Sequence, residues 1–245
     1  MPKRWYRIFQ AVLLLTLFLF LSTKVVSNQL SWYIHPRFAT LTLIGILFLG
    51  LLVYRLVLEM KGSFAPEHDE YDDRVAPVNL WIMLIPLLVG ILIPARPLGA
   101  ATVSTKGPIA SAPLVSSQAD NQERLVPAEK RNIVGWVTLF AFEENVDQYM
   151  GEEASVIGFV YHDKRLPPGQ FFVSRIVLSC CAADGYAFTM MVDWPQAASL
   201  KPDTWVRVTG PVGKAYFADD PQAIPLIHAT TVEIVPQPDD PYLFP

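Results

Sequence analysis

The run FATLTLIGILFLGLLVY, residues 38–54, contains no charged residue. A helix needs ~20 predominantly apolar residues to cross ~30 Å of hydrocarbon, and a terminal tyrosine suits the membrane interface. The run therefore predicts a transmembrane helix over residues 38–56. The composition of the whole chain, 52% hydrophobic and 17% charged, also favours a membrane protein over an ordinary soluble domain.

Two further apolar runs flank this one in the sequence. IFQAVLLLTLFLFLS (residues 8–22) predicts a helix over residues 6–23, and VAPVNLWIMLIPLLVGILIPA (residues 75–95) predicts another over residues 76–95. A cleaved secretory signal is the alternative for the first run, because basic residues precede it, but no small-residue cleavage pattern follows. We expect residues 1–98 to form a membrane domain with three transmembrane helices, in contact with membrane lipid.

Lysine and arginine residues near the ends of the runs predict the orientation, since cytoplasmic loops carry an excess of positive charge. One set is Lys3, Arg4, Arg7, Arg55, Lys61 and Arg74, and the opposite set is Lys24, Arg37, Arg96 and Lys106. The first set is the larger. We therefore expect a multi-pass protein of the cell membrane with a cytoplasmic N-terminus and an extracytoplasmic C-terminal domain.

The composition changes after the third run. Residues 99–130 are dominated by Ala, Ser, Thr, Pro and Gln, which is typical of a segment with too little apolar surface to fold, and we expect a flexible linker there. Asn132 is a good helix N-cap, and apolar residues follow it at three- and four-residue spacing. A short amphipathic helix is predicted from there to about Glu144.

Runs of β-branched and aromatic residues then predict five strands, each bounded by turn residues. They cover residues 153–162, 171–179, 186–194, 204–213 and 224–235. Five short strands in this layout favour an all-β OB-like barrel, with a small β-sandwich as the alternative, so residues 131–245 are expected to form a helix plus an OB-like β-domain. The region is not basic and has no phosphate-binding loop, so we expect no nucleic-acid partner.

The two cysteines of the chain are adjacent, in VLSCCAADGYAF (residues 177–188), between the second and third predicted strands. Asp184 and Gly185 form a hairpin signal, because glycine takes a positive φ without steric cost. Cys180 and Cys181 are therefore predicted at the tip of a hairpin, where side chains form sites more often than cores.

Three interpretations of the pair remain open. A vicinal disulfide would be strained, because consecutive Cα atoms lie about 3.8 Å apart whereas disulfides usually need ~4.4–6.8 Å. A metal site would suit zinc or copper(I), which thiolates select, with Asp184, His162 and His228 as the donors that could complete it. The third interpretation is that two small apolar side chains fill a turn.

The sequence resembles the YcgQ-like permease-subunit family of bacterial membrane proteins. The resemblance extends over most of the chain, and its most specific element is Cys-Cys-x-Ala-Asp, which places Cys180, Cys181 and Asp184 in the pattern. Gly185 stands where the family often has alanine. The segments that carry the resemblance are YIHPRF, IPARPLGAATVSTKG, VIGFVYHD, SRIVLSCCAADG, DTWVRVTGPVG and PYLFP.

The resemblance implies an accessory subunit of a two-protein membrane system whose partner is a predicted multi-spanning permease. The three runs contain no Asp, Glu, Lys or Arg, so a transport path inside this chain alone is not expected. We expect no enzymatic activity and a β-domain that presents the cysteine pair to a metal or a thiol-reactive substrate. The third run, interrupted by Pro77, Pro86 and Pro94, is the expected contact surface for the permease.

Two other functions remain open. A membrane-tethered thiol oxidoreductase would use the cysteine pair, although redox catalysts usually separate their cysteines by two residues. A structural assembly factor would use the β-domain as a binding surface without any chemistry. 

Overall fold

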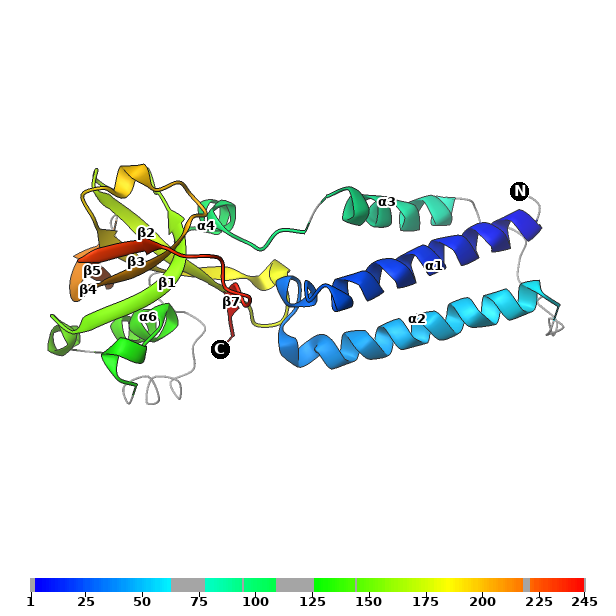
Figure 1. The fold of residues 1–245 in the computed structure, drawn as a ribbon, viewed down its shortest axis with the longest axis horizontal. Helices are drawn as coiled ribbons and strands as arrows, with labels where there is room; N and C mark the ends of the chain where they lie inside the picture. The colour runs from blue at the N-terminus through cyan, green and yellow to red at the C-terminus, as the bar shows by residue number, and fades with distance from the viewer. Residues whose placement is uncertain are drawn as a thin grey trace. The chain divides into compact units, whose positions relative to one another are not determined.

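The computed structural model describes residues 3–62, 78–93, 95–108, 126–143, 145–217 and 221–244 (Figure 1). The chain divides into two compact units, Met1–Arg96 and Pro97–Pro245. The N-terminal unit is helical, and the C-terminal unit is built on a β-sheet.

The N-terminal unit consists of three helices: α1 (Lys3–Val26), α2 (Ala39–Met60) and α3 (Val78–Leu92). Helix α1 contacts both α2 and α3. Glycines allow these close contacts, because a Cβ at Gly50 would lie 3.1 Å from the Phe18 ring and one at Gly90 would lie 3.1 Å from the Phe20 ring. The 3₁₀ turns η1 (Leu30–Trp32) and η2 (Pro36–Phe38) connect α1 to α2.

By length and composition, two of the described helices could cross a membrane. They are Arg7–Val26, with a mean hydropathy of 2.0, and Pro36–Met60, with a mean hydropathy of 2.4. Their apolar side chains mostly face outward: Leu41 is 66% exposed and Leu47 is 63% exposed. Such surfaces need apolar surroundings, so the first two predicted spans are matched by helices suited to a bilayer.

The third predicted span is not confirmed. Helix α3 has 15 residues, fewer than a span of the hydrocarbon core needs. Residues 63–77 and Pro94 lie outside the described part of the chain. A three-span membrane domain therefore stays a prediction.

The predicted linker contains a helix that composition did not reveal. Helix α4 (Ala100–Lys106) contacts strands of the C-terminal unit, and its Val103 side chain is fully buried. The backbone N–H of Ala100 donates to Asp203 Oδ1 at 2.6 Å. Residues 100–106 are thus ordered on the β-domain, whereas residues 109–125 of the predicted linker lie outside the described residues.

The C-terminal unit contains the predicted helix and strands. Helix α6 (Ile133–Phe142) begins after Asn132, whose side chain accepts the N–H of Gly135 at 3.0 Å, as expected of an N-cap. The 3₁₀ turns are η3 (Ala128–Lys130), η4 (Val146–Tyr149), η5 (Ala182–Asp184) and η6 (Ala197–Ser199). The strands are β1 (Glu153–Tyr161), β2 (Gln170–Val177), β3 (Tyr186–Asp193), β4 (Trp205–Tyr216), β5 (Ala223–His228), β6 (Thr231–Ile234) and β7 (Tyr242–Leu243).

The strands form one mixed sheet. Strands β1, β2 and β3 pair antiparallel in sequence, β3 pairs with β5 in parallel, β5 pairs antiparallel with β4, and β4 pairs antiparallel with β1. Strands β6 and β7 add to β4 and β2. Helix α6 packs on this sheet, and its Trp136, Val137 and Leu139 side chains are fully buried in the core.

The last predicted strand, residues 224–235, is divided into two. It is broken at Ala229 and Thr230 into β5 and β6, which pair with different parts of β4. The break brings the His228 carbonyl against the Cα of Gly210, where any side chain would collide with it. The other four predicted strands agree with β1 to β4 within a few residues.

Substitution of Gly158, in the middle of β1, tests the sheet. A Cβ there would lie 2.5 Å from the backbone oxygen of Ser174 and 3.0 Å from the side chain of Ile133, so Gly158→Ala forces β1 away from β2 and α6. Overpacking of this kind costs ~1–3 kcal/mol, and we expect the thermal unfolding temperature of the purified chain to fall by several degrees. Circular dichroism in the near ultraviolet measures it.

Gly213→Ala is the matched control, because the nearest atoms to its Cβ belong to the exposed His228 side chain, at 2.8 Å, and that ring can move aside. Equal unfolding temperatures for the two variants would contradict the packing described for β1.

Candidate functional site

The cysteine pair lies in the connection between β2 and β3. The last cross-strand pair is Val177 with Tyr186, so residues 178–185 leave the sheet together. The 3₁₀ turn η5 (Ala182–Asp184) occupies the second half of this connection. The prediction that Cys180 and Cys181 lie at the tip of the β2–β3 hairpin is confirmed.

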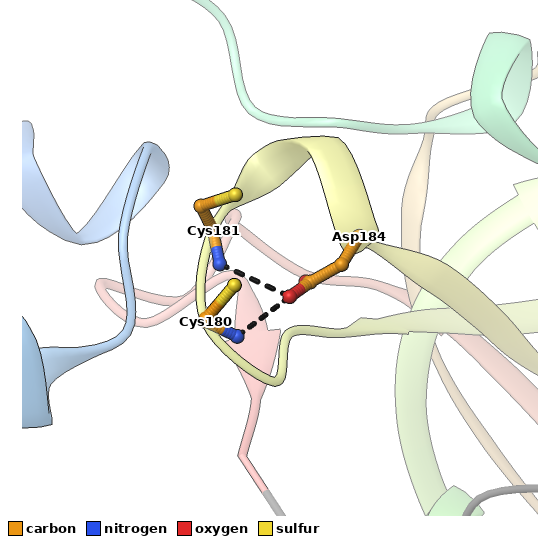
Figure 2. Close-up of side chains that lie close together, drawn as sticks. All are labelled: Cys180, Cys181 and Asp184. Carbon is orange, nitrogen blue, oxygen red and sulfur yellow. Dashed lines mark hydrogen bonds between the residues drawn. The ribbon is translucent and has the colours of Figure 1, made fainter.

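The carboxylate of Asp184 holds this loop in shape. Its Oδ2 accepts the backbone N–H groups of Cys180 at 2.7 Å and Cys181 at 3.3 Å (Figure 2). Its Oδ1 accepts the N–H of Ser179 at 3.2 Å. A carboxylate three residues into a helical turn that binds back to the N-cap N–H is a capping box. The acid therefore has to stand three residues after the second cysteine, which accounts for the spacing of the Cys-Cys-x-Ala-Asp element.

The same fold gathers three possible ligand atoms. The two Sγ atoms and a carboxylate oxygen of Asp184 all lie within 4.8 Å of one another. Zinc–sulfur bonds measure about 2.3 Å, so one ion between the sulfurs would fit this spacing. Cys180 is exposed, Cys181 is half-buried and both thiols are free. Within the described ranges this is the only group of three such side chains.

The carboxylate also controls the protonation of the thiol. A hydrogen bond to Asp184, followed by one to Cys181, raises the pKa of the Cys180 thiol to about 11. Burial raises the pKa of Asp184, but hydrogen bonds from the Cys180 thiol and from the loop N–H groups outweigh it, and on balance its pKa is lowered. At neutral pH, and with no ion bound, the loop therefore combines a carboxylate with a protonated Cys180.

Gly185 is required by space and not by its backbone angle. The positive φ predicted for it from the Asp-Gly pattern is wrong, since its φ is −56°. A Cβ on this residue would lie 2.8 Å from Leu98 Cδ1 and 2.9 Å from Leu178 Cδ2. The loop is thus closed against the segment that leads into α4.

Lys106, the last residue of α4, reaches the same loop. Its Nζ donates to the carbonyl oxygen of Ala183 at 3.0 Å and to that of Gly185 at 2.6 Å. Sequence reasoning missed this contact because Lys106 lies 77 residues before Ala183, in a stretch whose composition indicated a linker. The sequence contains no signal that links the two positions.

The structure does not bring the two predicted histidine ligands to the cysteines. His228 ends β5 and lies opposite Asp193, the last residue of β3, whereas the cysteine loop precedes Tyr186, the first. At ~3.3 Å per residue the two ends of β3 are about 23 Å apart. The Nδ1 atom of His228 is 3.7 Å from Asp193 Oδ2.

His162 belongs to that same distant end. It follows Tyr161, whose partner Phe172 lies near the start of β2, and its Nε2 is 2.8 Å from the carbonyl oxygen of Leu200. Only Asp184, of the three proposed additional donors, is close to the thiols. The sequence could not separate them, because adjacency around a closed series of strands depends on pairings between distant segments.

By its fold and site, this protein belongs to the class that joins apolar helices of membrane length to a β-sheet domain. The β-sheet domain carries a loop with two adjacent cysteines. The chain belongs to the DUF1980 family: residues 9–109 match the N-terminal domain of that family and residues 116–245 match its C-terminal domain. The predicted resemblance is confirmed.

Two of the relatives that the chain matches are bacterial proteins. The chain is 24% identical over 193 residues to "UPF0703 protein YcgQ" of Bacillus subtilis, covering 66% of this chain and 67% of the relative. It is 24% identical over 254 aligned positions to the "Putative two-component membrane permease complex subunit" of Streptococcus mutans, covering 89% of this chain and 92% of the relative.

Several solved structures match part of the chain. A small single-stranded DNA-binding protein from Streptomyces coelicolor aligns with 35% of this chain and 93% of its own, at 14% identity. The TM-score of 0.23 is too low to define a shared fold.

Substitution of Asp184 tests the electrostatics of the loop. Asp184→Asn removes the anion that raises the pKa of Cys180, so this pKa should fall towards the ordinary value of ~8.5, and alkylation of Cys180 at pH 8.5 should accelerate by about tenfold or more. Iodoacetamide labelling with site-resolved mass spectrometry measures the rate.

Asp193→Asn, at the opposite end of β3, is the control and should leave the rate unchanged. An Asp184→Asn rate equal to that of the unaltered chain between pH 8 and 10 would contradict the described hydrogen bond.

Proposed function

We propose that this protein is an accessory membrane subunit of a two-component permease, and that its β-domain, outside the cytoplasm, binds a soft metal ion through Cys180, Cys181 and Asp184. The observation that carries the metal site is the gathering of three ligand atoms within 4.8 Å. The permease role is supported by the similarity to the Streptococcus mutans subunit over nearly the whole chain.

The donor set fits the chemistry of zinc or copper(I). Two thiolates and a carboxylate would give zinc three protein ligands and leave its fourth position open, as in sites that exchange a ligand. Copper(I) would be satisfied by the thiolates. In either case both thiols have to lose their protons to the solvent when they bind the ion, and the raised pKa of Cys180 adds to this requirement, so binding should strengthen as the pH rises.

We further propose that the β-domain is an OB-type barrel. The support is the cyclic series of pairings, from β1 through β2, β3, β5 and β4 back to β1. Such closure leaves few unpaired strand edges. The connection between β2 and β3 would then be a barrel loop on a rigid support, which is a good position for a binding site.

The membrane arrangement is also a proposal. Outward-facing apolar side chains on α1 and α2 support contact with lipid, and the distribution of Lys and Arg supports a cytoplasmic N-terminus. We propose that a third span contains α3 and provides the contact with the permease. The apolar side chains of Ile85 and Leu92 on α3 are exposed.

A thiol oxidoreductase is a weaker candidate. The attacking species in thiol–disulfide exchange is a thiolate, and active-site cysteines usually have lowered pKa values. The pKa of Cys180 is raised instead, to about 11. Arg175, five residues before Cys180 in the sequence, lies over the Trp205 ring and donates to the carbonyl oxygen of Asp240.

Metal content tests the site directly. The chain purified in detergent under reducing conditions, then loaded with zinc(II) or copper(I) and desalted, should retain about one ion per chain, because its ligands are gathered before binding. Cys180→Ser and Cys181→Ser should each lose it, and Asp184→Asn should retain less. Elemental analysis beside thiol titration makes the measurement.

His162→Ala and His228→Ala are the matched controls, since both side chains lie at the far end of the β2–β3 hairpin, and they should bind as the unaltered chain does. Two freely titrating thiols with no retained ion would contradict the proposed metal site. If the proposed permease complex kept its full activity with the Cys180→Ser, Cys181→Ser double variant, this result would favour a structural assembly factor.

The partner surface is tested by site-specific crosslinking. A photo-crosslinking amino acid at Ile85 or Leu92 of α3 should capture a multi-spanning permease co-expressed with the chain, because these side chains are exposed on the proposed contact helix. The same group at Leu41 or Leu47 of α2 should label lipid instead. Capture from α2 and none from α3 would contradict the assignment.

A further inference from the structure

The ammonium of Lys106 binds the carbonyl groups on both sides of Asp184. It donates to Ala183, the residue before the acid, at 3.0 Å and to Gly185, the residue after it, at 2.6 Å. These two carbonyls belong to the Ala183–Asp184 and Gly185–Tyr186 peptide units, which lie on either side of Asp184 and Gly185. Their orientation sets the direction in which the chain carries the Asp184 side chain.

The contacts continue from the acid to the thiols. The Asp184 carboxylate binds the N–H groups of Ser179, Cys180 and Cys181. One cation from α4 is therefore linked, through one carboxylate, to the backbone that carries both sulfurs. The sulfurs and the carboxylate are the ligand atoms proposed above.

Helix α4 offers Lys106 a fixed base. Val103 is fully buried, the N–H of Ala100 is held by Asp203, and the N–H of Leu98 donates to the Tyr242 hydroxyl at 2.7 Å. The Leu98 side chain also fills the space beside Gly185. A long, flexible lysine side chain that starts from such a base loses less freedom when it binds the loop.

We propose that Lys106 is a positioning residue of the Cys180–Cys181–Asp184 site: it touches no ligand atom, but it holds the turn so that Asp184 faces the two thiols. The inference rests on the proposed metal-binding function. Partners of this kind outside the ligand shell orient the ligands of metal sites. The site is therefore completed by the segment that follows α3 in sequence, and not by the β2–β3 hairpin alone.

Lys106→Met tests the proposal, because methionine keeps an apolar side chain on α4 and removes the donors. In the full chain in detergent, zinc(II) affinity from competition with a chromophoric chelator should fall by about 10- to 100-fold. Lys106→Arg should restore much of it. Hydrogen exchange should accelerate at the amides of Ser179, Cys180 and Cys181 and stay unchanged in β2 and β3.

Asp203→Gly is the matched control. It releases the other end of α4, at a residue whose φ of 65° suits glycine, without touching the cysteine loop. Its zinc affinity should stay within about threefold of the unaltered chain, a difference well under the 1.4 kcal/mol of a tenfold change. An equal loss in Asp203→Gly and Lys106→Met would overturn the proposal, because general loosening of α4 would then be sufficient.

Failure of this inference and failure of the metal site are distinguishable. If the unaltered chain binds zinc and Lys106→Met binds it equally well, the positioning role is overturned and the metal site stands. If the unaltered chain binds no ion, the metal site fails, and the exchange measurement decides: faster exchange confined to the loop of Lys106→Met supports positioning, and unchanged exchange overturns it.

Discussion

The cysteine loop depends on one carboxylate. Asp184 accepts three backbone N–H groups in a connection that leaves the sheet, where no strand partner could satisfy them. A hydrogen bond to a charged acceptor is worth about twice a neutral one, so a single side chain can replace the missing ladder. The loop needs no disulfide to keep its shape, and its thiols stay available for chemistry.

The local elements could be predicted from the sequence. The N-cap at Asn132, the strand positions and the hairpin that carries Cys180 and Cys181 follow from short-range rules of periodicity and capping. The three-residue spacing from Cys181 to Asp184 also follows from local geometry. Its role as acceptor for three N–H groups follows from the same capping geometry, although the residue pattern predicted for the acid only a hairpin turn and a possible ligand.

The other features of the fold and of the site depend on pairings between segments that are distant in the sequence. His162 and His228 looked equivalent to Asp184 as donors, and only the register of β1, β2, β3 and β5 places them at the other end of the sheet. Helix α4 was missed because burial of Val103 against strands far away in sequence overrides a polar, linker-like composition. A lysine in such a segment gives no sign that it binds a particular loop.

The charges around the pair explain why a protonated thiol and a cation site are compatible. The Asp184 anion that disfavours a Cys180 thiolate in the empty loop would favour any cation placed between the same groups. Binding an ion would replace the protons of both thiols with the metal and leave the loop backbone in place, because the loop is already held by its N–H groups and by Lys106. The proposed site, which would resist thiolate chemistry when empty and release protons on binding a soft cation, suits the proposed permease subunit better than it suits a redox catalyst.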